Sequence, residues 1–118
     1  MITPIELVQR GLRRVTTAPV VSKVPNPRPP LFVRVDSSTS RALSPVHAQA
    51  LVIIQVYGLD LEEVLTTVSA CRQYLTDRID ADDPLVFGWG EHTLVEFPDP
   101  DIPDTRWQLT GQLIYTLT

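Results

Sequence analysis

The chain has 118 residues, of which 43% are hydrophobic and 20% are charged, with a net charge of -4. This size and balance predict one domain spanning residues 1–118. The longest apolar run, residues 50–54, is far shorter than the roughly 20 residues needed to cross a bilayer, and the first residues lack a secretory signal. We therefore expect a cytoplasmic protein without membrane association. Its single cysteine, Cys71, excludes an internal disulfide and a cysteine-based zinc site.

Charge is distributed unevenly along the chain. Residues 1–59 carry seven Lys or Arg against two Asp or Glu, whereas residues 60–118 carry three against twelve. Either this is ordinary surface variation, or it places complementary faces on neighbouring copies of a ring. A pI near 5.0 is atypical of a DNA-binding domain. The basic edge of Arg10, Arg13 and Arg14 therefore favours contact with the acidic half of an adjacent copy.

The first half predicts one short helix followed by strands. Thr3 as N-cap, Pro4 at the first helical position and Glu6 in a capping box predict the helix start. Beyond it we expect a brief strand over 20–24, a stiff proline connector over 25–30, a strand over 31–36, a polar loop over 37–45 and a long strand over 48–57. Both faces of the 48–57 strand carry apolar residues, which predicts a central strand with helices on one side and a neighbouring subunit on the other.

The second half predicts a long amphipathic helix and two further strands. Asp60 as N-cap with Glu63 gives a capping-box pattern, and Leu59 is placed to staple against Val64. The apolar stripe of this helix comprises Leu61, Val64, Leu65, Val68, Cys71, Leu75 and Ile79. A strand over 85–96 is expected to bulge or bend at its two glycines, and the alternating segment 106–118 predicts a half-buried terminal strand. Together these elements predict an α+β fold with a mainly antiparallel sheet of about five strands and two helices on one face.

Catalytic patterns find little support. Cys71 lies on the apolar stripe and is expected in the core. His47 and His92 are far apart, with no third histidine to complete a site. The acidic segment 80–91 lacks the glycine and a ligand position of a calcium loop. Four carboxylates, those of Glu96, Asp99, Asp101 and Asp104, could in principle collect a divalent ion, but aspartates that accept local backbone hydrogen bonds are the favoured interpretation. We expect no cofactor, no metal and no enzymatic activity.

The most informative stretch is Val95-Glu96-Phe97-Pro98-Asp99-Pro100-Asp101, which continues through Pro103 and Asp104 into the terminal strand at Arg106 and Trp107. A proline- and aspartate-rich connector followed by an arginine, an aromatic and a polar residue resembles the C-terminal signature of tail terminator (tail completion) proteins of long-tailed bacteriophages. The resemblance extends over most of the chain. It departs from the commoner form at residues 102–105, which replace a small glycine-containing turn.

The resemblance implies a structural virion protein. Members of this family are implied to form a hexameric ring that caps the tail tube, ends its polymerisation and docks the tail to the head connector or stopper complex. The implied partners are other copies of the chain, the major tail tube protein and the head connector, with DNA at most passing through the ring lumen. The implied location is the neck of the virion, after assembly in the host cytoplasm.

We expect ring or axial contacts from the loop 37–45, which holds Arg41, and from the connector with Asp99, Asp101 and the adjoining Arg106. Trp89, between two glycines, is either an interface anchor that projects outward or a residue partly buried against the first helix. Two other functions stay open. One is a head-closure or neck protein that also forms a ring, and the other is a small metal-dependent hydrolase that uses the carboxylates of 96–104.

Overall fold

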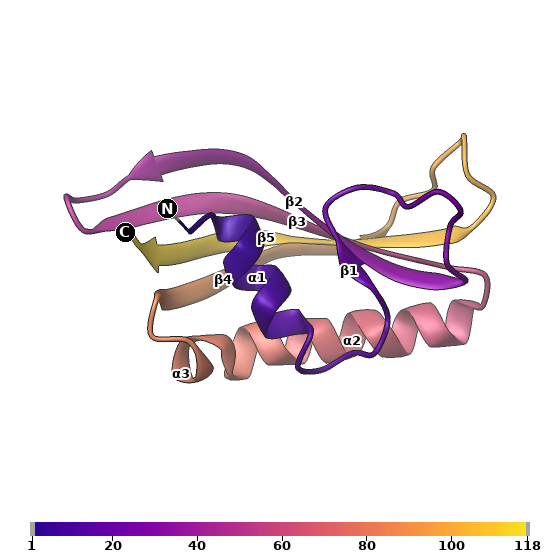
Figure 1. Cartoon of the computed structure of the whole chain (residues 1–118), viewed down its shortest axis with the longest axis horizontal. Coiled ribbons are helices and arrows are strands. Elements are labelled where there is room, and N and C mark those ends of the chain that lie inside the picture. The colour runs from indigo at the N-terminus through magenta and orange to yellow at the C-terminus, as the bar shows by residue number, and fades with distance from the viewer. Residues whose placement is uncertain (1, 118) are drawn as a thin grey trace.

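Helices and strands pack in two layers in a computed structural model, which describes residues 2–117 (Figure 1). The elements in chain order are α1 (Pro4–Leu12), β1 (Val20–Val21), β2 (Leu31–Ala42), β3 (His47–Gly58), α2 (Leu61–Asp77), α3 (Ile79–Asp82), β4 (Val86–Glu96) and β5 (Thr105–Thr116). The five strands form one sheet in the order β1-β2-β3-β5-β4. β1 runs parallel to β2, and the other neighbours are antiparallel. The predicted α+β class is confirmed, and β3 lies at the centre of a mixed sheet.

One hydrophobic core lies between the sheet and the helices. Alternate residues of β3 and β5 point to one side because side chains alternate along a strand. They meet Leu7 and Leu12 of α1 and the buried stripe of α2. The strand residues in this core include Val33, Val35, Ala50, Val52, Ile54, Val56, Leu109 and Leu113. Each of the larger buried side chains contributes about 1.5–3 kcal/mol, so this layer fixes both helices on the same face.

The N-terminal helix begins as predicted. The Thr3 hydroxyl accepts a hydrogen bond from the Glu6 backbone N–H at 3.2 Å, and Pro4 occupies the first turn. The helix ends at Leu12, one turn before Val15. None of the helices described between residues 2 and 117 is long and apolar enough to cross a membrane.

The predicted loop over 37–45 is wrong. β2 continues to Ala42 and pairs with β3, after a register shift between Ser37 and Ser40. Only a short turn over 43–46 separates the two strands. Serine and threonine do not prevent a strand when a long partner supplies the hydrogen bonds of the ladder. The Ser37 hydroxyl adds to them by donating to the Leu51 carbonyl at 3.1 Å.

The stripe predicted for α2 is wrong at its start. Asp60 caps the helix by accepting a hydrogen bond from the Glu62 N–H, but Leu59 is 72% exposed and does not form the expected staple. Leu61 and Leu65 are exposed as well. The buried residues of α2 are Val64, Thr67, Val68, Cys71, Tyr74 and Leu75. α2 ends at Asp77, and Ile79 is buried in the separate short helix α3.

The last two strands lie close to the residues predicted for them. β4 is interrupted by register shifts between Val86 and Gly88 and between Glu91 and Thr93. The predicted interruption of the strand is therefore present, but it flanks the two glycines, which themselves pair with β5 in regular register. In β5 the residues Leu109, Gly111, Leu113 and Tyr115 are buried, in strict alternation. Thr118, the last residue of the predicted strand, lies outside the described residues.

The molecule is elongated, with extents of 43 × 25 × 24 Å. The β2–β3 turn, the start of β4 and the end of β5 lie at one end of the long axis (Figure 1). The β3–α2 turn and the connector between β4 and β5 lie at the opposite end (Figure 1).

Candidate interaction surfaces

The connector between β4 and β5 is held to the sheet by Arg106. This side chain is only 8% exposed. Its Nε and Nη2 atoms donate hydrogen bonds to the carbonyls of Phe97 and Pro98, and Nη1 donates to the Tyr57 hydroxyl at 3.2 Å. The guanidinium also lies over the Phe97 ring, 4.9 Å from its centroid, and over the Tyr57 ring at 5.5 Å. All these contacts are internal, so Arg106 shapes the connector. The sequence had placed Arg106 among the ring or axial contacts, but the buried residue offers a partner almost no surface.

Three aspartates of the connector have different surroundings. The Asp99 carboxylate lies 3.7 Å from Nη1 of Arg106 and accepts a hydrogen bond from the Asp101 N–H at 3.0 Å. The Asp104 side chain is only 2% exposed and lies 3.6 Å from Nη2 of Arg28. Asp101 is exposed and makes no ion pair within residues 2–117. Of the three, Asp101 is therefore the carboxylate that a partner can reach.

The carboxylates of residues 96–104 do not converge. Within the described part of the chain, no three His, Cys, Asp or Glu side chains gather closely enough to hold a metal ion. Asp99 and Asp104 each lie beside an arginine instead. Local hydrogen bonding, with Asp99 accepting from the Asp101 N–H, matches the favoured interpretation of the connector.

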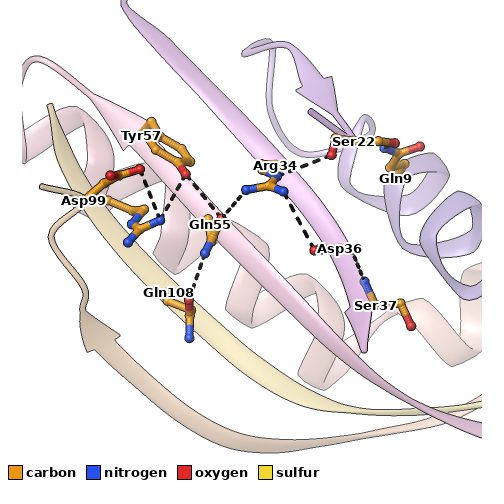
Figure 2. Close-up of polar contacts among 10 residues, drawn as sticks. Gln9, Ser22, Arg34, Asp36, Ser37, Gln55, Tyr57, Asp99 and Gln108 are labelled. Carbon is orange, nitrogen blue, oxygen red and sulfur yellow. Dashed lines mark hydrogen bonds and ion pairs between the residues drawn. The ribbon is translucent and has the colours of Figure 1, made fainter. Parts of the chain in front are cut away.

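A row of polar side chains crosses the sheet face opposite the helices (Figure 2). Arg34, Gln55 and Gln108 are direct neighbours on β2, β3 and β5. Arg34 Nη1 donates to Gln55 Oε1 at 3.4 Å, Gln55 Nε2 donates to Gln108 Oε1 at 2.9 Å, and the Tyr57 hydroxyl donates to the same Gln55 oxygen at 3.3 Å (Figure 2). Through Tyr57 this row continues to Arg106. The uncovered face is therefore polar and ordered along this row, whereas Leu51, Ile53 and Ile114 make another part of the same face apolar.

Arg41 lies near the end of β2, in the part of the hairpin that extends beyond the core. It is exposed, and it makes no ion pair or side-chain hydrogen bond with any residue of 2–117. Ser40, beside it, shares a hydrogen bond of 2.7 Å with the Tyr115 hydroxyl, which ties this part of β2 to β5. Arg41 is thus a cation without a partner on a supported strand.

Trp89 is partly buried, as in the second of the two arrangements that the sequence left open, but the contact it makes is with β5. Its indole lies on Gly111 of β5, where an added Cβ would come within 2.4 Å of Cζ2. The ring is half-buried and packs against the core. Contact between the exposed edge of the ring and another copy stays a prediction, but the side chain does not project outward between its two glycines.

Part of the uneven charge is neutralised within one chain. Arg10 lies 2.8 Å from Asp83, Arg14 lies 3.5 Å from Asp82, and Arg28 lies 3.6 Å from Asp104. Each pair joins the basic first half to the acidic second half. Arg10 and Arg14 therefore have acidic partners within the same chain, and their contact with an adjacent copy stays a prediction.

Cys71 is a core residue. It is buried, and burial raises the pKa of its thiol to about 12. At pH 8 the thiol is therefore protonated and shielded. We expect a thiol reagent to detect no cysteine in the native protein and one per chain in denaturant. Ser69→Cys, at an exposed position of the same helix, is the matched control and is expected to react at once. Rapid labelling of native wild-type protein would contradict the assignment of Cys71 to the core.

The sequence reasoning missed the residues that hold the connector. Tyr57 and Gln55 were assigned only to a strand, and the pairing of β3 with β5 brings them beside Arg106 and Gln108. The signal in the sequence was the presence of a tyrosine and a glutamine within an otherwise apolar strand.

Comparison of the chain with models of protein families and with curated proteins gives no match.

Proposed function

We propose that the chain is a ring-forming structural protein that caps a phage tail tube, ends its polymerisation and docks the tail to the head connector. The observation that carries the proposal is the connector 97–104, held by Arg106 and followed by the terminal strand. It is the segment whose residues resemble the tail terminator signature.

Several features support a role in assembly. The connector projects from one end of the molecule (Figure 1) and is anchored at Phe97, Pro98 and Asp99. A constrained segment loses little conformational entropy on binding, which favours specific contact. The uncovered sheet face offers a further broad surface.

The mechanism would be steric. Weak contacts between copies close a ring through cyclic symmetry, and many such contacts act together when the ring engages a tube of matching symmetry. The seated ring then occupies the growing end, so no further tube subunit can add.

The proposal is tested by adding the purified protein to polymerising tube protein and measuring tube lengths by electron microscopy. We expect shorter tubes with an end cap, and a loss of capping of roughly tenfold for Asp101→Ala, equivalent to one interface contact of about 1.4 kcal/mol. Asp77→Ala removes an equally exposed carboxylate from α2 and is expected to cap normally.

Tubes that grow to the same length with and without the protein would remove the proposal. A ring that leaves tubes unchanged but binds the connector complex would instead favour the head-closure or neck protein.

A further inference from the structure

The exposed large hydrophobic side chains of residues 2–117 gather at the two ends of the molecule. At the hairpin end they are Leu43, Val46, Phe87 and Leu117, which we call the tip surface. At the opposite end Leu59, Leu61 and Leu65 form a group that we call the base surface, and Val95 and Phe97 lie at the same end on the sheet face away from α2. Single exposed hydrophobic residues are ordinary, but two separate groups of them indicate contact surfaces.

The tip surface is one continuous patch. The Leu117 N–H donates to the Val46 carbonyl at 2.8 Å, and the Leu43 N–H donates to the His47 carbonyl at 2.9 Å. The His47 and Phe87 rings are 4.6 Å apart. Val46 is 56% exposed and Phe87 is 66% exposed, so the patch presents large apolar groups on a firm backbone.

The base surface has one hollow at Leu59 and another beside the start of α2. One hollow of about 250 Å³ is lined by Leu59, Arg28, Pro29, Pro30 and Asp104. Another, of about 330 Å³, lies beside the start of α2 and is lined by Leu31, Asp60, Glu62, Glu63, Thr66 and Thr67. Hollows of this size next to exposed leucines can receive apolar side chains of a partner.

The two surfaces are complementary in charge. Arg41 stands beside the tip surface and makes no ion pair with any other residue of the described part of the chain. Glu62 and Glu63 stand at the base surface, exposed and without an ion pair within residues 2–117. Because the surfaces lie at opposite ends of a molecule 43 Å long, one chain cannot join them to each other.

We propose that the tip surface of one copy docks on the base surface of the next, with Leu43 and Val46 against Leu59 and Leu61, and Arg41 facing Glu62 and Glu63. The inference rests on the proposed ring and specifies which surfaces form it. A contact between two different surfaces repeats from copy to copy, and it closes into a ring when the rotation per copy allows.

Crosslinking tests the arrangement. Val46→Cys and Leu61→Cys are prepared separately, and buried Cys71 contributes no accessible thiol. With a short bismaleimide, the mixture is expected to yield crosslinked dimers at least about tenfold above either variant alone, because the contact raises the effective thiol concentration. Thr76→Cys, exposed on α2 but away from the base surface, replaces Leu61→Cys as control and is expected not to crosslink. A Val46→Cys protein that crosslinks to itself, or a mixture without product, would overturn the proposal.

Charge reversal gives an independent measurement. We expect Arg41→Glu, and separately Glu62→Arg with Glu63→Arg, to weaken self-association roughly tenfold in sedimentation velocity. Combining all three changes in one chain restores it. Lys23→Glu makes the same charge change elsewhere and should leave association unchanged. Partial variants that associate as the wild type, or a combined variant that does not recover the association lost by the partial variants, would overturn the assignment.

The two proposals fail separately. Crosslinked rings that do not shorten tail tubes would remove the proposed function and leave the interface standing. Capped tubes together with no crosslink between Val46→Cys and Leu61→Cys would remove the interface and leave the function standing.

Discussion

Replacement of Arg106 by alanine is expected to lower the free energy of unfolding by about 3 kcal/mol, as is typical when one member of a buried charged network is removed. The guanidinium donates to two connector carbonyls and to the Tyr57 hydroxyl. Without it, these acceptors and the Asp99 carboxylate lose their partner. The stacking of the guanidinium over Phe97 and Tyr57 is lost as well.

Urea unfolding followed by tryptophan fluorescence measures this loss. Arg34→Ala is the control, because that side chain is more exposed and its hydrogen bonds to Gln55 and Ser22 are long, at 3.4 and 3.3 Å; we expect a loss below about 1 kcal/mol. Arg106→Lys keeps the charge but loses the fork of donors, and its stability should fall in between. Equal stabilities of Arg106→Ala and Arg34→Ala would show that Arg106 does not hold the connector.

Replacement of Gly111 by alanine is expected to cost about 2–3 kcal/mol through overpacking. A Cβ at this position would lie 2.4 Å from Trp89 Cζ2 and 2.7 Å from the Gly90 carbonyl oxygen. The indole would have to move off β5, and the backbone of β4 would have to shift with it. Calorimetry should show the loss as a lower melting temperature.

Gly88→Ala is the matched control on the neighbouring strand. A Cβ there meets nothing within 4 Å, so its stability should lie within about 0.5 kcal/mol of wild type. Replacing the indole by a smaller side chain in Trp89→Leu should recover part of the stability lost in Gly111→Ala. A double-mutant cycle measures this recovery as a coupling energy. Additive effects in that cycle would contradict the close packing of Trp89 on Gly111.

The order of helices and strands could be predicted because its signals are local. Capping at Thr3 and Asp60, and the period-two pattern of β5, depend on residues close in sequence. The extension of β2 to Ala42 could not be predicted in this way, because its hydrogen bonds come from β3. The prediction of the buried stripe at the start of α2 was wrong for another reason. Leu61 and Leu65 match a helical stripe as well as Val64 and Val68 do, and only the sheet decides which stripe is buried.

The candidate surfaces were predictable to a similar extent. Arg41 and Asp101 are exposed as their polar surroundings indicated. The burial of Arg106 was not visible, since it depends on Tyr57, which lies 49 positions earlier in the chain. The sequence also could not show whether the unevenly distributed charges pair within one chain or between two copies, because ion pairs such as Arg10 with Asp83 join residues 73 positions apart.

The two register shifts of β4 bear on how the protein avoids aggregation. β4 is an edge strand, paired with β5 only, and an exposed flat edge is a template for uncontrolled sheet growth and amyloid. Irregularities next to Gly88 and Glu91 bend such an edge and interrupt its row of free N–H and C=O groups. These two irregularities therefore make the β4 edge a poor template for the addition of a further strand.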